Sequence, residues 1–181
     1  MFEQVVLGMI LDRELTGYDI KKEIEGSIGK FYKASHGKLY PTLKKLTDKE
    51  FLTMREQNQG GRQKKYYQAT VLGRANFLDW LSAPVSRNVD WDVQLAKIFF
   101  YGELPRELRD KRLQEYEFYV RQGLEHLEAM EKELPSENLD DKDYYGIATL
   151  YFGIQSTQNA LYWLGYIREQ NPLSAFLRKR D

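Results

Sequence analysis

Cysteine is absent from the 181-residue sequence, and histidine occurs only twice. Without cysteine the chain can form no disulfide and can use no thiolate as a nucleophile or metal ligand. No apolar run approaches the roughly 20 residues that a membrane-spanning helix needs, and no charged-then-apolar leader opens the chain. We therefore expect a soluble, untargeted cytoplasmic protein that does not contact a membrane.

Groups that support catalysis or metal binding are also scarce. His126 lies beside Glu125 and close to Glu128, but consecutive positions point to different sides of a helix, which disfavours a shared metal ion. Gly60-Gly61 lacks the strand-to-helix context and the lysine-serine ending of a phosphate-binding loop. We predict no enzymatic activity, no metal and no cofactor.

The net charge of zero hides an asymmetry between the two halves of the chain. Residues 1–75 hold 14 Lys and Arg against 9 Asp and Glu, which gives +5, and residues 76–181 hold 13 against 18, which gives −5. Charge on small proteins is rarely uniform, so the split by itself carries little weight. The basic half is nevertheless where a polyanion is expected to dock.

The basic half begins with a pattern of three helices. Val5, Val6, Met9 and Ile10 give residues 2–11 a dense apolar face, and Thr16 with Asp19 resembles a capping pair at the start of a second helix that ends near residue 29. In residues 35–46, Ser35 is the expected N-cap. Leu39, Leu43 and Leu46 recur at helical spacing. Pro41 should kink this third helix or delay its regular part. The second and third helices together form a helix-turn-helix unit.

A hairpin and a fourth helix follow. Residues 52–57 and 64–69 are strand-compatible runs on either side of Gly60-Gly61, which predicts a two-stranded wing that leans on the helices through Leu52, Met54 and Tyr66. Thr70 is expected to cap a helix over residues 71–81. The fold class is therefore mainly α with a small β-hairpin. Residues 1–83 are a winged helix-turn-helix domain, and residues 89–181 form a helical dimerisation and effector domain.

This layout favours binding of double-stranded DNA. The side chains best suited to phosphates are Lys33, Lys44, Lys45, Lys64 and Lys65, and the candidates for base edges or positioning bonds are Ser35, His36, Lys38 and Tyr40. Arg62 suits either a minor groove or a phosphate bridge. Two alternatives stay open: these charges only solvate exposed faces, or the basic head binds an acidic partner protein.

The pattern of apolar residues in the acidic half predicts three helices, over residues 91–101, 104–134 and 144–169. The last helix has an apolar seam formed by Ile147, Leu150, Ile154, Leu161 and Leu164, and a second, aromatic face. A helix that is apolar on more than one side is buried on more than one side. We therefore predict a homodimer with this seam in the interface. The alternative is a monomeric three-helix satellite domain.

A small-molecule effector is a further expectation. Aromatic and amide groups that could face the junction of the two domains are Trp91, Tyr151, Gln155 and Tyr162, and Tyr18 lies at the inner edge of the second helix. The competing interpretation, which the residue types favour, is that these side chains serve core and interface packing.

Several segments together resemble the PadR family of transcriptional regulators: Gly17-Tyr18-Asp19-Ile20, Phe31-Tyr32, the run from Gly37 to Leu46, Gly61-Arg62 leading into Lys65-Tyr66-Tyr67, and Thr70-Val71-Leu72-Gly73. The long tail is similar to the subclass that includes repressors of phenolic-acid decarboxylase genes. The resemblance implies a dimeric repressor on an inverted repeat, released by a small, phenolic molecule bound in the C-terminal region. Ala69 stands where the family usually has a larger aliphatic residue, which implies a softer anchor for the wing.

Overall fold

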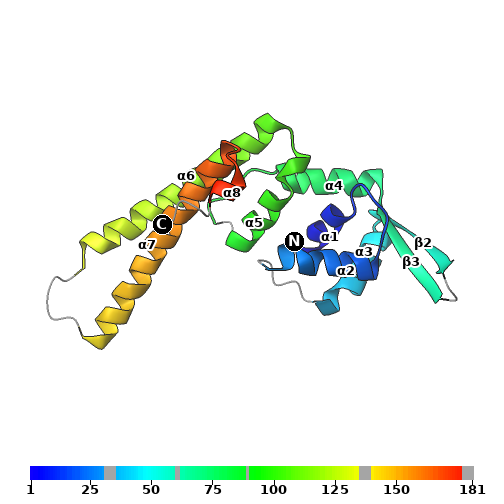
Figure 1. Cartoon of the computed structure of the whole chain (residues 1–181), viewed down its shortest axis with the longest axis horizontal. Helices are drawn as coiled ribbons and strands as arrows, with labels where there is room; N and C mark the ends of the chain where they lie inside the picture. Colours follow the sequence, from blue (N-terminus) through cyan, green and yellow to red (C-terminus); the bar gives the residue numbers. More distant parts are fainter. Residues whose placement is uncertain (31–35, 60–61, 89, 135–139, 177–181) are drawn as a thin grey trace. The chain divides into compact units, whose positions relative to one another are not determined.

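The structure, a computed structural model, describes residues 1–30, 36–59, 62–88, 90–134 and 140–176. These residues divide into two compact units, 1–106 and 107–181, each described here by itself (Figure 1). The expected fold class is confirmed, because helices dominate and the strands form one small antiparallel sheet. Within the described residues, no helix combines the length and apolarity that a membrane crossing requires.

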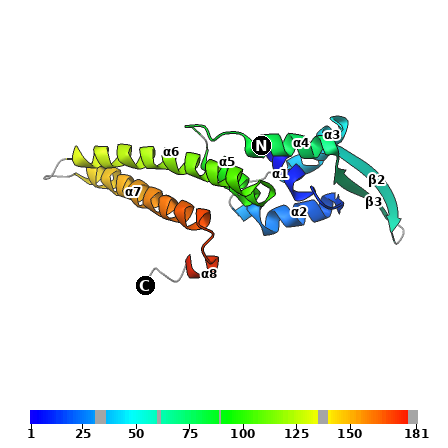
Figure 2. The same ribbon diagram turned by 90° about the horizontal axis from the view of Figure 1, so that it is seen from above.

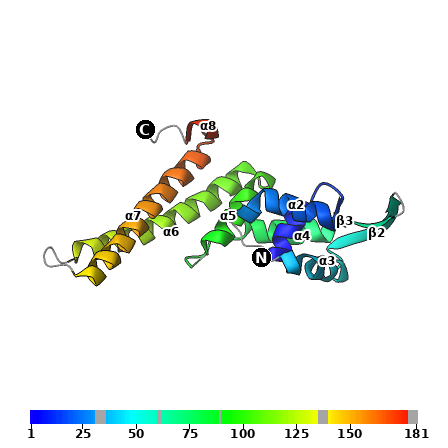
Figure 3. The ribbon, with the colours of Figure 1, turned by 60° about the horizontal axis from the view of Figure 1, so that its bottom comes forward.

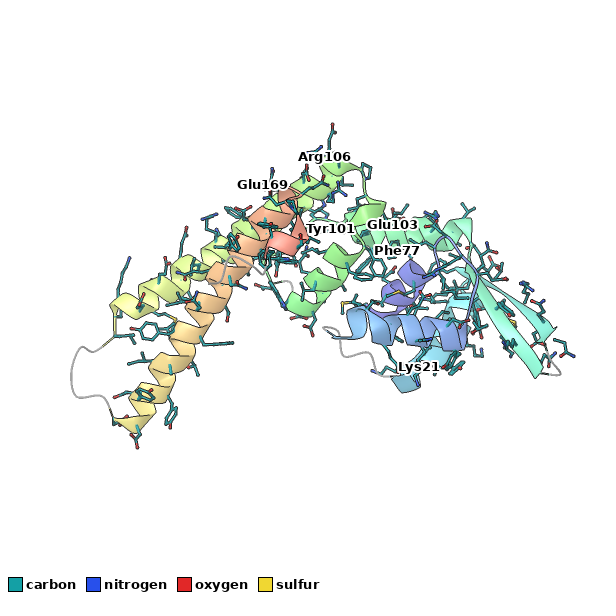
Figure 4. All side chains as sticks on the ribbon, viewed as in Figure 1. Lys21, Phe77, Tyr101, Glu103, Arg106 and Glu169 are labelled. Atoms are coloured by element: carbon teal, nitrogen blue, oxygen red, sulfur yellow. The ribbon has the colours of Figure 1, made fainter. Side chains whose placement is uncertain are left out.

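Four helices build the first unit around a shared core. Helix α1 (Phe2–Met9) contacts α2 (Gly17–Gly26), α3 (Leu39–Asp48) and α4 (Val71–Ser82), and Figure 3 shows it lying among them. Val5, Val6 and Leu7 of α1 are fully buried. Phe77 of α4 is also fully buried, and its side chain points into the unit (Figure 4). Burial of these side chains supplies most of the free energy that holds the helices together.

Helix α2 begins as the sequence predicts. The Thr16 hydroxyl accepts a hydrogen bond from the Asp19 amide at 3.2 Å, and the Asp19 carboxylate accepts one from the Thr16 amide at 3.3 Å. This reciprocal pair satisfies amides that lack partners in the first turn. A short 3₁₀ turn, η1 (Ile28–Lys30), follows the helix.

Helix α3 begins later than its apolar pattern suggests. A 3₁₀ turn, η2 (His36–Lys38), precedes it, and the N-cap is Lys38, which makes no side-chain capping bond. Pro41 is the third helical residue. It lies in the first turn, where a backbone amide has no intrahelical acceptor, so the ring delays the regular helix without breaking it. Leu39, Leu43 and Leu46 are buried as predicted.

The wing belongs to a sheet of three strands, so the prediction of two was incomplete. The strands β1 (Leu15–Thr16), β2 (Leu52–Gln59) and β3 (Arg62–Ala69) are ordered β1-β3-β2, and Leu15 pairs with Tyr67. Figure 1 shows the β2-β3 hairpin extending from the helices of its unit. Two residues of β1 carry no strand pattern that a sequence window can recognise.

The anchor of the wing differs from the expected one. Leu52 and Tyr67 are buried, whereas Met54 is exposed and Tyr66 is only half-buried. Tyr66 lies on the other face of β3, where the Arg55 guanidinium stacks over its ring at 4.8 Å. Successive side chains of a strand alternate between faces, so choosing between Tyr66 and Tyr67 requires the register.

Thr70 joins the end of α3, the start of the wing and the start of α4. Its amide donates to the Phe51 carbonyl at 3.0 Å, its hydroxyl donates to the Glu50 carbonyl at 2.7 Å, and the same oxygen accepts from the Gly73 amide at 2.9 Å. These three bonds set the angle between the third helix and the wing.

The first unit also includes α5 (Trp91–Phe99) and η3 (Tyr101–Glu103). Phe100, which ends α5, packs edge-on against Phe77 with ring centroids 5.3 Å apart. Gly8 permits this approach, because a Cβ there would lie 2.6 Å from the Phe100 ring. The contact-based division at residue 106 thus groups α5 with the N-terminal helices, and the functional division into 1–83 and 89–181 stays a prediction.

The second unit is built on α6 (Arg106–Lys132) and α7 (Asp141–Arg168), which run antiparallel side by side (Figures 1 and 2), followed by α8 (Leu173–Phe176). A capping box at Asp140 starts α7. A Cβ at Gly153 of α7 would lie 3.6 Å from Leu127 of α6, and Arg168 of α7 pairs with Glu117 of α6 at 3.3 Å. These contacts join the two long helices.

The residues of the expected dimer seam differ in burial within one copy. Ile154 and Leu164 of α7 are buried, with Leu164 only 1% exposed, and Ile147, Leu150 and Leu161 are half-buried. The place of this seam in a dimer interface stays a prediction. The exposed apolar side chains of α7 lie on its aromatic face: Tyr144, Tyr145, Tyr151, Phe152 and Tyr162.

Candidate nucleic-acid interface

The outer face of α3 is polar and basic. Tyr40 is 62% exposed, and Lys38, Lys44 and Lys45 are exposed as well, while the leucines of the same helix point into the core. Gly17 lies against the Tyr40 ring, because a Cβ added at Gly17 would be 2.9 Å from its Cε1 atom. The start of α2 therefore supports Tyr40 from behind.

The lysines of α3 differ in what they contact. The Lys44 ammonium pairs with Asp48 one turn later at 2.7 Å, whereas Lys45 reaches Glu3 of α1 at 2.6 Å, where Lys49 also pairs at 3.1 Å. The hydrogen bond from Lys45 lowers the pKa of Glu3, burial opposes that shift, and Lys49 adds to it. Lys45 thus ties α3 to α1, and a phosphate must compete with Glu3 to recruit it.

The wing presents further cations. Lys64 and Lys65 are exposed on β3, and Lys65 faces Glu56 of β2 across the hairpin at 3.6 Å. The Gln63 side chain donates to the same carboxylate at 2.7 Å. An ion pair of this length on an exposed hairpin is weak, so Lys65 is available to a stronger anion.

A groove of about 740 Å³ separates the wing from the outer face of α3. Tyrosines and one methionine supply its apolar surface, and lysines from both elements supply its positive charge. Its lining residues are Thr16, Gly17, Tyr18, Asp19, Tyr40, Lys44, Thr47, Asp48, Met54, Gln63, Lys64, Lys65 and Tyr67. The helix-turn-helix and the wing therefore share one concave, partly cationic surface.

Arg55 fixes the outer side of the wing and was missed as a functional residue. Its guanidinium donates to both oxygens of Glu14, with the Nε bond at 2.5 Å, and also to Gln57 at 3.0 Å. The hydrogen bond to Arg55 lowers the pKa of Glu14. A bidentate pair restrains the orientation of its two side chains more strongly than a single contact does. Arg55 therefore holds β2 against the segment before β1.

The structure brings four of the ten predicted DNA-binding residues into the groove, namely Tyr40, Lys44, Lys64 and Lys65. Lys38 is exposed at the start of α3, and Lys45 contacts Glu3. Lys33 and Ser35 lie outside the described residues, as do the side chains of His36 and Arg62. Sequence reasoning missed Met54 and Tyr67 as groove residues, because the strand register alone shows which face they occupy.

The five predicted effector residues are divided between the two units. Tyr18, which is 68% exposed, lines the groove with the predicted DNA-binding residues, and Trp91 is exposed at the first position of α5. Tyr151, Gln155 and Tyr162 lie on the exposed face of α7, where Phe176 of α8 stacks on Tyr162 at 5.4 Å. No group of three or more potential metal ligands gathers in the part of the chain that the structure describes.

A buried helical core, a solvent-facing third helix and a β-hairpin beside it define a winged helix-turn-helix domain. Comparison with known families agrees: residues 6–79 match the Transcriptional regulator PadR-like family, and residues 92–170 match the Virulence activator alpha C-term family. Residues 6–79 therefore form a PadR-like family domain.

Two curated proteins are similar to parts of the chain. The Negative transcriptional regulator PadR of Bacillus subtilis is 36% identical over 110 residues, which are 59% of this chain and 60% of that protein. A probable transcriptional regulator of Mycobacterium tuberculosis is 29% identical over 82 residues, or 45% of this chain and 43% of that one. Both alignments therefore span less than two thirds of the curated relative.

Solved structures of Bacillus subtilis PadR are similar to the whole chain at a lower level. The structure in complex with operator DNA is 27% identical, covers 93% of this chain and 98% of its own, and has a TM-score of 0.46. The structure in complex with p-coumaric acid is also 27% identical, with 93% and 97% covered and a TM-score of 0.43.

Proposed function

We propose that this protein is a dimeric repressor that binds an inverted-repeat operator through its winged helix-turn-helix domain and leaves it when a small aromatic effector binds. The observation that supports DNA binding best is the groove, into which α3 and the wing direct Tyr40, Lys44, Lys64 and Lys65. Repression is supported by the name of the Bacillus subtilis relative, a negative transcriptional regulator.

The roles of the groove residues follow from their chemistry. The lysines neutralise phosphates on the DNA backbone, while Tyr40 and Lys38, at the exposed start of α3, face the base edges. Exchange of Lys64 and Lys65 for glutamine should weaken binding to all DNA sequences to a similar extent. Exchange of Lys38 or Tyr40 changes the preference among sequences.

A mobility-shift assay with the upstream region of the protein's own operon tests this function. If about six phosphates are neutralised per dimer, the logarithm of the affinity falls against the logarithm of the salt concentration with a slope of about −5. Excess random duplex should leave the specific complex in place. A flat salt response contradicts the electrostatic contribution, and retention that depends on an acidic protein instead of DNA would favour the alternative partner.

The dimer interface that we propose is the exposed aromatic face of α7 with the adjoining side of α6. Phe152 is 74% exposed and Tyr145 is 69% exposed, and the seven-residue step between them places both on the same side of the helix. An aromatic row of this kind is unfavourable in water unless another surface covers it. A second copy provides that cover with the twofold symmetry that an inverted repeat requires.

Phe152→Glu tests this interface, because a carboxylate at the centre of the face disfavours its burial. Light scattering at micromolar concentration should give two chains per particle for the wild type and one for the variant. Phe152→Tyr is the matched control, since it keeps an aromatic ring at the same position and should leave two chains per particle. A wild type with one chain per particle rejects the dimer.

The effector site that we propose uses Tyr151, Gln155 and Tyr162 of α7. Two aromatic rings and one amide on the same exposed face can stack on a planar ligand and orient a polar substituent. Release requires that the ligand bind the DNA-free state more tightly than the DNA-bound state. Aromatic carboxylic acids, phenolic acids first, should therefore dissociate the bound duplex in a titration, and Gln155→Ala should raise the concentration needed.

A further inference from the structure

Tyr67 is a buried residue that lines the groove between α3 and the wing. It lies in β3 opposite Met54 and on the same strand face as Lys65, two residues earlier. The residue is only 8% exposed, and its hydroxyl makes no hydrogen bond with any residue in the described part of the chain. The hydroxyl oxygen is not itself a buried atom, so a ligand in the groove can reach it.

The surroundings of the Tyr67 hydroxyl suit an anionic oxygen. The neighbouring groups are the Lys65 ammonium, the Tyr40 hydroxyl from α3 and, across the hairpin, the Glu56 carboxylate. Burial raises the pKa of Tyr67, so the hydroxyl keeps its proton at neutral pH and acts as a donor. Hydrogen bonds from neutral donors to a phosphate are charge-assisted and strong.

The charges along the groove also favour an anionic ligand. Three lysines, Lys44, Lys64 and Lys65, line it together with two aspartates. Both aspartates already have partners, because Asp48 pairs with Lys44 and Asp19 caps the first turn of α2. Lys65, two residues from Tyr67, makes a long pair with Glu56 at 3.6 Å, and a pair of this length on an exposed hairpin leaves the lysine available to a stronger anion.

We propose that the Tyr67 hydroxyl donates a hydrogen bond to a DNA backbone phosphate that is seated between α3 and the wing, with Lys65 as its counter-charge. This inference rests on the proposed function, because the occupant is a phosphate of the bound duplex. The contact from Tyr67 at the base of the wing is additional to the DNA contacts proposed for the hairpin lysines and for α3. The phosphate completes the hydrogen bonding that the fold leaves open.

Tyr67→Phe tests the contact in the full-length protein, since it removes only the hydroxyl. On an upstream duplex that the wild type binds, the affinity should fall about tenfold or more, as expected for a lost hydrogen bond to a charged group. The salt slope should stay the same, because no charge is removed. The melting temperature should stay the same or rise, since a hydroxyl without a protein partner does not stabilise the fold.

Tyr66→Phe is the matched control, because it removes a hydroxyl one residue earlier on the opposite face of the same strand. Its affinity should match that of the wild type. A Tyr67→Phe variant that binds as tightly as the wild type overturns the inference, and so does one whose weaker binding is accompanied by a lower melting temperature, since that marks a structural role.

A set of duplexes, each with one phosphate replaced by a neutral methylphosphonate, locates the contact. At one position in each half-site, wild type and Tyr67→Phe should bind with equal affinity, because the hydrogen bond is already lost. A tenfold difference that persists at every position overturns the inference. If the wild type binds none of the duplexes, the proposed function fails as well, and the two failures are thereby distinguished.

Discussion

Replacing Gly73 with alanine should disturb the junction between the third helix, the wing and α4. A Cβ at Gly73 would lie 2.1 Å from the Phe51 carbonyl oxygen and 2.9 Å from its carbon, whereas real Cβ atoms essentially never approach within 3.0 Å. Both obstacles are backbone atoms, so no side-chain rotation relieves the clash. The backbone must move by about 0.9 Å, the difference between 2.1 and 3.0 Å.

A shift of that size breaks specific bonds. The Phe51 carbonyl accepts from the Thr70 amide at 3.0 Å, and the Gly73 amide donates to the Thr70 hydroxyl at 2.9 Å. An unsatisfied buried backbone group costs about 1–3 kcal/mol, and a lost helix cap costs about 1 kcal/mol. The gain in helix propensity from alanine returns up to about 1 kcal/mol. The net loss is therefore about 1–4 kcal/mol.

Thermal unfolding measures this loss. In a chain of this size a change of 1 kcal/mol shifts the melting temperature by about 2–4 °C, so Gly73→Ala should melt about 2–16 °C lower than the wild type. Gly123→Ala is the control, because Gly123 lies inside α6 and a Cβ there meets nothing within 4 Å. It should be neutral or stabilising. Equal melting temperatures for Gly73→Ala and the wild type would refute the reasoning.

Two further predictions concern the support of α3. Glu3→Gln removes the negative charge that pairs with Lys45 and should lower stability at pH 7 by about 1 kcal/mol or less, since the pairs are largely exposed. Because the folded-state pKa of Glu3 lies below the ordinary glutamate value of 4.5, this contribution is present above that value and is lost as the pH falls through the lowered pKa. Urea unfolding at pH 7 and pH 3 should therefore show a difference that shrinks at pH 3, and a constant difference would contradict the ion-pair argument. Gly17→Ala should push the Tyr40 ring away from α2, because its Cβ would lie 2.9 Å from that ring, and should weaken DNA binding in a mobility-shift assay with little effect on the melting temperature. Unchanged binding would show that the position of Tyr40 does not matter.

Local patterns in the sequence predicted much of the fold. The leucine stripe of α3, the capping pair of Thr16 and Asp19 and the cap at Thr70 all lie where they were expected. Each depends on residues no more than seven positions apart, so a short window of sequence contains both partners. The groove residues Tyr40, Lys44, Lys64 and Lys65 were found the same way, as exposed basic or aromatic positions of a helix and a hairpin.

Contacts between distant segments were not predictable in this way. Lys45 was expected to face a phosphate, but it pairs with Glu3, 42 residues away, and Arg55 holds Glu14, 41 residues away. Which side of α7 is buried likewise depends on how the rest of the chain packs against it. Nothing in the composition of either segment specifies these partners.

The order of the longer helices and of the two wing strands, the basic head and the family resemblance follow from the sequence alone, because periodicity, caps and turns act over a few residues. The tertiary structure decided which lysines pair with another helix and which line the groove, and it placed Tyr67 rather than Tyr66 in the groove lining. The physical reason is that a side chain's partner depends on strand register and helix packing, which bring together segments that are far apart along the chain.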